Sequence, residues 1–149
     1  NYGGAPWKAQ YWLREVMNRM YTPTPDAYCG DEDNGQTSAW YVFSALGFYP
    51  VCPGTDQYIL GAPLFKKATI HLENGNDVVI SAPENSKENI YVDAMKVNGQ
   101  NYTKNYFTHG DLMNGAKVDV KMSATPNTQR GTAEEDLPYS FTKEMATKK

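Results

Sequence analysis

Residues 35–47 read Gly-Gln-Thr-Ser-Ala-Trp-Tyr-Val-Phe-Ser-Ala-Leu-Gly, and this stretch decides which fold the chain can adopt. The seven apolar residues between Ala39 and Leu46 cover almost every side of a helix, and Gly47 suits the left-handed position that ends one. A helix that is apolar all round is buried, and this one is too short to span a bilayer. We therefore expect a helix over about residues 35–46 that needs several helical neighbours.

The segment before it predicts another helix, over residues 6–21. Pro6 suits the first turn, and the Thr-Pro-Thr-Pro run at 22–25 ends the helix. Apolar side chains recur at three- and four-residue spacing and predict one buried stripe: Ala9, Trp12, Leu13, Val16, Met17 and Met20. The polar residues Lys8, Arg14, Glu15, Asn18 and Arg19 are expected to face away from it. Two helices cannot cover both apolar surfaces alone, so we expect the chain to be a piece of a longer protein.

From about residue 57 the pattern changes to short runs typical of strands. These runs cover residues 58–60, 68–72, 78–81, 90–92, 95–97 and 117–122. In the last run Val118, Val120 and Met122 alternate with charged residues, which predicts one buried and one exposed face. Asn74-Gly75 and Asn98-Gly99 lie between runs and predict tight hairpin turns. The pattern favours an antiparallel, sandwich-like β-module.

Composition excludes some functions and leaves others open. The 149 residues carry a net charge of −3 without a long basic run, which argues against a nucleic-acid binder. No apolar run approaches the roughly 20 residues of a membrane span. Eleven of the 19 aromatic residues lie in the first 50, where they form a dense core or line a surface that stacks on sugars. Cys29 and Cys52 are equally compatible with a disulfide and with two free thiols.

The densest polar feature is Gly30-Asp31-Glu32-Asp33-Asn34-Gly35-Gln36. One interpretation is a solvated loop in which Asn34 or Asp33 caps the following helix, whose dipole favours the negative charges. The other is a catalytic or metal site, with Asp31 and Asp33 projecting to one side as a general base or as oxygen ligands of Ca²⁺. The spacing fails the EF-hand pattern, because Gly35 stands at its fifth position and Gln36 at its sixth.

Four segments together resemble the C-terminal part of glycoside hydrolase family 92. They are Tyr2-Gly3-Gly4-Ala5-Pro6-Trp7-Lys8, the block from Cys29 to Val51, Gly61-Ala62-Pro63-Leu64-Phe65, and Met122-Ser123 to Pro126-Asn127. The resemblance covers residues 1–127 and implies an α+β chain. Residues 1–55 would be the last helices of an (α/α)₆ catalytic barrel and residues 56–142 an antiparallel β-module. The polar composition of residues 143–149 separately predicts a flexible tail.

The same resemblance implies a bacterial, calcium-dependent, inverting exo-α-mannosidase, of α-1,2 specificity, that trims terminal α-mannosides from glycans. It implies export to the periplasm, cell surface or medium. The partners would be the glycan and the rest of the polypeptide, namely an N-terminal β-sandwich and the remaining barrel helices. The family's general acid glutamate and its Gly-Asn-Glu-Pro calcium motif lie outside these residues. We therefore expect the isolated chain to be inactive and to bind Ca²⁺ weakly or not at all.

The resemblance also assigns site residues. Asp33 matches the general base and a contributor to the calcium site, and Asp31 matches the assisting aspartate two positions away. Glu32 is expected to bind substrate or to orient the loop, and Trp7 to lie near the sugar. His71 and His109 are expected to be a surface and a turn histidine. The alternatives are a carbohydrate-binding or structural β-module, or a calcium-binding interaction domain.

Overall fold

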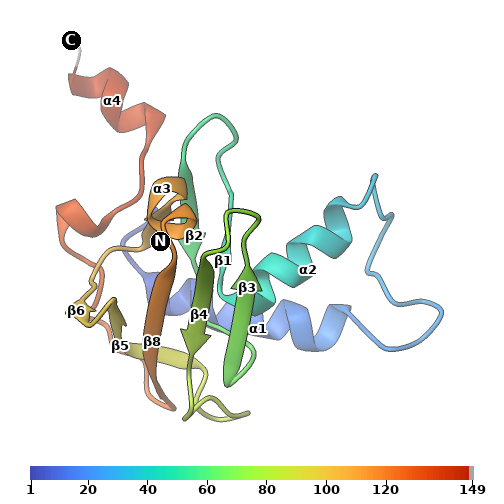
Figure 1. The fold of residues 1–149 in the computed structure, drawn as a ribbon. Helices are drawn as coiled ribbons and strands as arrows, with labels where there is room; N and C mark the ends of the chain where they lie inside the picture. Colours follow the sequence, from blue (N-terminus) through green and yellow to red (C-terminus); the bar gives the residue numbers. More distant parts are fainter. Residues whose placement is uncertain (148–149) are drawn as a thin grey trace.

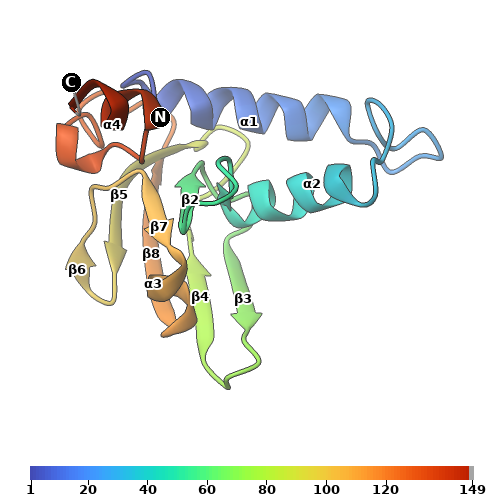
Figure 2. The same ribbon diagram turned by 90° about the horizontal axis from the view of Figure 1, so that it is seen from above.

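The computed structural model describes residues 1–147, which form a helical hairpin packed on a β-rich body (Figure 1). The hairpin consists of α1 (Pro6–Met20) and α2 (Gln36–Leu46), and both views show the two helices side by side (Figure 2). Both helices were expected within one residue of these bounds. Gly47 has a φ of 98° and its N–H bonds the carbonyl oxygens of Phe43 and Ser44, which ends α2 as its sequence predicts.

The β-rich body contains two sheets. The smaller is antiparallel, in the order β1 (Phe48–Tyr49), β2 (Gln57–Leu60), β7 (Tyr106–Thr108). The larger has the order β3 (Lys67–His71), β4 (Asp77–Ser81), β8 (Ala116–Ser123), β5 (Tyr91–Val97), β6 (Gln100–Asn101). The remaining elements are α3 (His109–Met113), a 3₁₀ turn at Glu134–Asp136 and α4 (Phe141–Thr147).

The larger sheet is mixed, so the expectation of a purely antiparallel β-module is wrong. Strands β4 and β8 pair in parallel, with Val78 opposite Ala116 and Ile80 opposite Val118. Parallel neighbours need a long connection, and here the chain between them contains β5 to β7 and α3. Local turn signals predict hairpins but carry no information on this distant pairing.

Both predicted hairpin turns are present. Asn98 and Gly99 have φ values of 50° and 82°, the left-handed pair that a two-residue turn between β5 and β6 requires. Gly75, with a φ of 85°, lies in the turn between β3 and β4. The expected runs at 90–92 and 95–97 form one strand, β5, interrupted by a bulge between Val92 and Ala94.

The hydrophobic core lies between the two sheets. The inward side chains of β8 alternate as predicted, and Val118 is 1% exposed. Phe48 and Phe107 of the smaller sheet meet edge to face, with ring centroids 6.0 Å apart. The core residues from the larger sheet are Val78, Ile80, Val92, Met95, Ala116, Val118, Val120 and Met122. This packing supports a sandwich-like β-module despite its one parallel pairing.

Helix α1 buries two polar side chains, those of Gln10 and Arg14, against the β-module. The expectation that Arg14 faces away is therefore wrong, whereas Lys8, Asn18 and Arg19 are exposed as expected. Arg14 is 6% exposed and donates to the carbonyl oxygen of Pro63 at 2.8 Å and to Oδ1 of Asn85 at 2.9 Å. Gln10 accepts from the backbone N–H of Val92. Of the predicted apolar stripe, Met17 is buried but Trp12 is 63% exposed. Buried main-chain groups of the β-module need partners, and these polar side chains supply them.

Helix α2 is also less covered than its composition predicts. Only Ser44 and Ala45 are buried in it, and Val42 is 56% exposed. Within the described residues α1 is its one long helical neighbour. The hairpin therefore presents an apolar surface, as expected of two helices that cannot cover each other completely.

The C-terminal segment, predicted as a flexible tail from residue 143, is helical over 141–147, while residues 148 and 149 lie outside the described part. Figure 1 shows α4 projecting from the β-rich body. Cys29 and Cys52 are both free, Cys29 exposed and Cys52 partly so. No helix among the described residues has the length and apolar character needed to cross a membrane.

Candidate active site

The acidic loop, residues 30–36, connects to α2 through an unusual backbone. Asp33, Asn34 and Gly35 have consecutive positive φ values of 50°, 58° and 87°. Residues other than glycine adopt this left-handed conformation at a cost, and such strain collects at functional sites. A strained aspartate three residues before the first residue of α2 favours the catalytic interpretation of the loop over a merely solvated one.

Glu32 holds the acidic loop on the start of α2. Its Oε1 accepts from the backbone N–H of Ser38 at 3.1 Å, and its carbonyl oxygen accepts from the N–H of Thr37 at 3.2 Å. The Thr37 hydroxyl also donates to the carbonyl oxygen of Asp31 at 2.9 Å. The expectation that Asn34 or Asp33 caps the helix is therefore wrong. Gly35 occupies the cap position without a side chain, and Glu32 binds a free N–H of the first turn instead.

The carboxylates of Asp31 and Asp33 remain available. Both residues are exposed, and neither side chain makes a hydrogen bond or an ion pair with the described residues. Glu32 differs, because its second oxygen, Oε2, is enclosed yet has no partner there. The loop thus divides its three acids into one that positions the backbone and two that can accept a proton or contact a ligand.

Trp7 lies in the first turn of α1, whereas the acidic loop follows the far end of that helix (Figures 1 and 2). The 15 residues of α1 make it about 22 Å long, far more than one sugar ring spans. The structure does not bring Trp7 together with Asp31 and Asp33. Contact of Trp7 with the sugar stays a prediction, and any such contact would lie at the start of α1 rather than at the acidic loop.

Next to the acidic loop lies a hollow that sequence reasoning did not single out. This tyrosine hollow is lined chiefly by Tyr21, Thr22, Pro23, Tyr28, Ser38 and Tyr41. Desolvation raises the pKa of the Tyr21 phenol, so its hydroxyl stays a hydrogen-bond donor, here to the carbonyl oxygen of Thr37. The concentration of aromatic residues in the first third of the sequence was the signal that could have located it.

The described residues do not form a metal site by themselves. They contain no group of three or more His, Cys, Asp and Glu side chains placed to hold an ion. Ca²⁺ takes six to eight oxygen ligands, so Asp33 could supply only part of such a set. The histidines are elsewhere: exposed His71 lies 2.8 Å from Asp77 in its own hairpin, and His109 begins α3 beside Tyr58.

Comparison with known proteins identifies the family. The family model described as the glycosyl hydrolase family 92 catalytic domain matches residues 1–124. The chain belongs to glycosyl hydrolase family 92. Its acidic loop, α1, α2 and both sheets all fall inside the family's catalytic domain, which places the loop in a domain of glycosidases.

Solved structures of family 92 support the same conclusion. An inverting mannosidase from Bacteroides thetaiotaomicron VPI-5482 is 53% identical, with a TM-score of 0.89 over 95% of this chain. An α-mannosidase from Bacteroides thetaiotaomicron is 41% identical, with a TM-score of 0.90 over 94% of this chain, and has also been solved in complex with mannoimidazole. A protein of Arthroderma benhamiae named "uncharacterized secreted glycosidase" is 24% identical over 95% of the chain.

The chain spans only a small part of these relatives. It covers 19% of each of the two Bacteroides thetaiotaomicron proteins and 18% of the Arthroderma benhamiae protein. The family 92 assignment therefore applies to a part of a catalytic domain in which α1 and α2 expose the apolar surface described above.

Proposed function

We propose that this chain supplies the general base of an inverting exo-α-mannosidase that removes terminal, α-1,2-linked mannose from glycans. The observation that carries the proposal is Asp33. It has a strained backbone, an exposed carboxylate without a partner among the described residues, and a place beside the helix start that Glu32 fixes. Two relatives in family 92, one an inverting mannosidase and the other an α-mannosidase, support the reaction and the sugar.

In an inverting mechanism two carboxyl groups stand roughly 6.5–9.5 Å apart, one on each side of the scissile bond. Asp33 would accept a proton from a water molecule as that water attacks the anomeric carbon from the face opposite the leaving oxygen. Asp31 would accept a second hydrogen bond from the same water and orient it. A protonated carboxyl group on the other side would give its proton to the leaving oxygen, and that group would come from a part of the polypeptide outside this chain.

The general base then lies in this chain, and the general acid lies in another part of the polypeptide. The isolated chain is inactive because it holds the base without the acid. Ca²⁺ acts in the complete enzyme, with most ligands supplied from outside these residues. Export of the bacterial enzyme is supported by the relative named as secreted. Glu32 acts mainly by orienting the loop, since one of its oxygens is already bound to α2.

The test uses a polypeptide of the relatives' full length that carries this chain. Asp33→Ala should lower kcat on α-1,2-mannobiose by about 10²–10⁴-fold, as removal of an acid–base residue does. Added azide should restore turnover and yield β-mannosyl azide, because the small anion attacks from the face that the base served. Asp26→Ala removes another exposed carboxylate of the same connection and should leave kcat within about twofold. An Asp33→Ala enzyme with turnover within a few-fold of the parent would refute Asp33 as the base.

A further inference from the structure

The backbone carbonyl groups of the three acids in the acidic loop all accept hydrogen bonds from the first turn of α2. The carbonyl oxygen of Asp31 accepts from the hydroxyl of Thr37 at 2.9 Å. That of Glu32 accepts from the backbone N–H of Thr37 at 3.2 Å, and that of Asp33 accepts from the N–H of Gln36 at 3.2 Å. Thr37 therefore supplies two of the three donors. Its hydroxyl is the one side-chain donor among them, so substitution can remove that bond and leave the other two in place.

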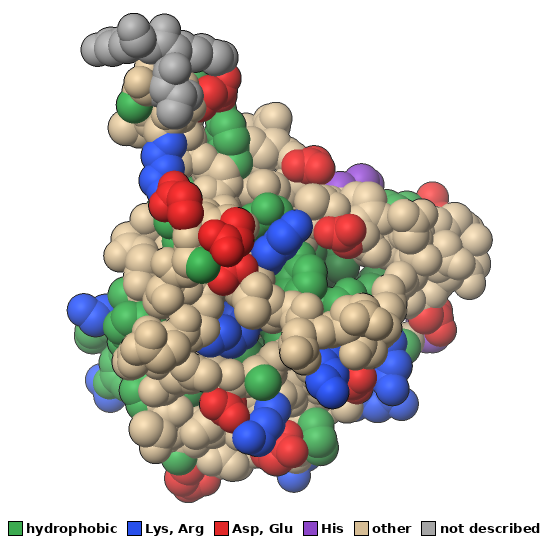
Figure 3. All heavy atoms as spheres, turned by 90° about the vertical axis from the view of Figure 1, so that its left-hand side faces the viewer, with side chains coloured by type: hydrophobic (Ala, Val, Ile, Leu, Met, Phe, Trp, Pro, Cys, Tyr) green, Lys and Arg blue, Asp and Glu red, His purple; other side chains and the backbone are tan. Residues whose placement is uncertain are grey.

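The acidic loop needs such bonds because its own charges and backbone oppose a fixed shape. Three adjacent carboxylates repel one another, and none of them forms an ion pair with the described residues. On the face of the molecule shown in Figure 3, Asp and Glu side chains are instead interspersed with Lys and Arg side chains. The left-handed backbone of Asp33 and Asn34 adds strain. A strained loop persists in one conformation only where the surrounding structure imposes it.

Thr37 is itself held in place from two sides. It is the second residue of α2 and is partly buried, and its β-branched side chain has few rotamers in a helix. Its carbonyl oxygen accepts from the hydroxyl of Tyr21, the residue that directly follows α1, at 3.2 Å. The bond from the Thr37 hydroxyl to Asp31 therefore ties the acidic loop to both helices of the hairpin. Fixing the Asp31 carbonyl also fixes the backbone from which the Asp31 carboxylate projects, two residues before Asp33.

We propose that Thr37 is a positioning residue of the active site, whose hydroxyl holds Asp31 so that the Asp31 carboxylate orients the attacking water for Asp33. This inference rests on the proposed function, because it takes Asp33 as the general base and Asp31 as its assistant. Thr37 contacts neither the substrate nor the water and acts through Asp31. A displaced Asp31 carboxylate weakens the transition state more than the bound substrate, so the loss of the hydroxyl lowers kcat and leaves KM nearly unchanged.

The experiment uses a polypeptide of the relatives' full length that carries this chain, with α-1,2-mannobiose as substrate. Thr37→Val removes the hydroxyl with little change of shape and should lower kcat by about tenfold, with KM within about twofold. Thr37→Ser keeps the hydroxyl and should hold kcat within about threefold of the parent. Thr55→Val is the matched control, because the Thr55 hydroxyl also donates to a carbonyl oxygen, that of Cys52 at 3.0 Å, outside the acidic loop. This control should leave kcat within about twofold. Thr37→Ala also lacks the hydroxyl and favours a helix, so it gives the same readout should Thr37→Val fail to fold.

An Asp31→Ala background distinguishes positioning from a merely structural role. Asp31→Ala should lower kcat at least as much as Thr37→Val does. Once the Asp31 carboxylate is absent, adding Thr37→Val should lower kcat by no more than about a further twofold, because the group that the hydroxyl positions is gone. A further tenfold loss in that background would overturn the proposal. So would a Thr37→Val kcat within twofold of the parent, a loss confined to KM, or equal losses for Thr37→Ser and Thr37→Val.

Asp33→Ala is measured in parallel, so that the two proposals fail separately. If Asp33→Ala lowers kcat by about 10²–10⁴-fold while Thr37→Val leaves it unchanged, only the role of Thr37 is wrong. If Asp33→Ala leaves kcat within a few-fold of the parent, the proposed function is wrong, and the positioning role of Thr37 is overturned with it.

Discussion

Glu32 accepts a hydrogen bond from the backbone N–H of Ser38, with 3.1 Å between Oε1 and nitrogen, and this contact ties the middle acid of Asp31-Glu32-Asp33 to α2. The acids on either side are exposed and make no side-chain contact of this kind with the described residues. Glu32 therefore fixes the loop to α2, while the carboxylates of Asp31 and Asp33 on either side stay exposed. This division explains how three consecutive acids can coexist, since one of them has a fixed donor in the first turn of a helix.

Replacing Glu32 should show how much its contact with Ser38 stabilises the fold. Glu32→Ala removes the acceptor for Ser38 and should destabilise the chain by about 1 kcal/mol, typical of losing a helix cap, with a fall in melting temperature of roughly 2–4 °C. Glu32→Gln keeps an oxygen acceptor and should recover most of that stability. Thermal unfolding followed by circular dichroism measures both variants. Equal melting temperatures for Glu32→Ala and the parent chain would show that the contact contributes nothing.

Arg14 should be among the most sensitive positions of α1. Arg14→Met leaves the carbonyl oxygen of Pro63 and Oδ1 of Asn85 without their donor, and we expect a loss of about 2–4 kcal/mol in the free energy of unfolding. A double-mutant cycle with Asn85→Ala should give a coupling of about 0.5–3 kcal/mol. Urea denaturation supplies the values.

The matched control for Arg14 is Arg19→Met on the same helix. The Arg19 side chain is 75% exposed and pairs with Glu15 at 2.7 Å. Exposed pairs of this kind contribute about 0.3–0.5 kcal/mol, so this substitution should be nearly neutral. Similar losses for the two arginine variants would contradict the role assigned to the buried one.

The two arginines show where sequence reasoning succeeds and where it stops. Both helices and both Asn-Gly turns were predictable, because periodicity, Pro6 and glycines with positive φ are local signals. Arg14 was wrongly expected to face away. Its partners, Pro63 and Asn85, are distant in sequence, so the helix pattern gives no signal of these contacts. The parallel pairing of β4 with β8 escaped prediction for the same reason.

The candidate site, too, was predictable only where its residues are adjacent in sequence. The acidic loop was recognisable because Asp31, Glu32 and Asp33 are adjacent in sequence and carry a family motif. The contact of Glu32 with Ser38 and the tyrosine hollow could not be predicted, because both depend on how the chain turns from α1 back to α2. That turn brings the Tyr21 ring against the rings of Tyr28 and Tyr41. Composition alone indicated only that the first third holds an excess of aromatic residues.

Gly131 should tolerate no side chain. Its φ is 71°, and an added Cβ would lie 2.8 Å from Cγ of Asn105, which is 1% exposed and donates to the Gly131 carbonyl oxygen. Gly131→Ala should cost about 3 kcal/mol or more, because both the backbone and a buried hydrogen bond must shift. Gly54→Ala is the matched control, since Gly54 has a φ of 92° with nothing within 4 Å of the added Cβ. It should cost only about 1 kcal/mol, for the left-handed backbone alone. Equal midpoints of urea unfolding for the two variants would contradict the clash at Asn105.

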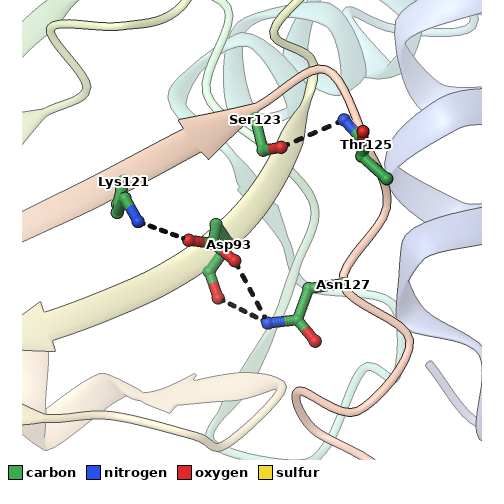
Figure 4. Close-up of polar contacts among 5 residues, drawn as sticks. All are labelled: Asp93, Lys121, Ser123, Thr125 and Asn127. Carbon is green, nitrogen blue, oxygen red and sulfur yellow. Dashed lines mark hydrogen bonds and ion pairs between the residues drawn. The ribbon is translucent and has the colours of Figure 1, made fainter.

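Asp93 should give the chain part of its acid sensitivity. It is the extra residue of the bulge in β5, and Figure 4 shows its carboxylate between Lys121, at 2.8 Å, and the amide of Asn127. The hydrogen bond from Lys121 holds the pKa of Asp93 below its usual value. A carboxyl group whose pKa is lower in the folded state than in the unfolded chain stabilises the fold above the unfolded pKa of about 3.9. That contribution is lost as the pH falls through the lower folded pKa.

Melting temperatures of the parent chain and Asp93→Asn, measured between pH 2 and 7, test this linkage. The parent should be the more stable at pH 6. The difference should begin to shrink near pH 4, where the unfolded chain's carboxyl becomes protonated, and should be lost once the pH falls below the lower folded pKa. Because the Lys121 side chain is 66% exposed, salt should weaken the effect. In a Lys121→Ala background the Asp93→Asn substitution should lose most of its pH-dependent effect, since the strongest cause of the pKa shift is gone. A difference between parent and Asp93→Asn that is constant from pH 2 to 7 would show that the contact of Asp93 with Lys121 acts through packing rather than through charge.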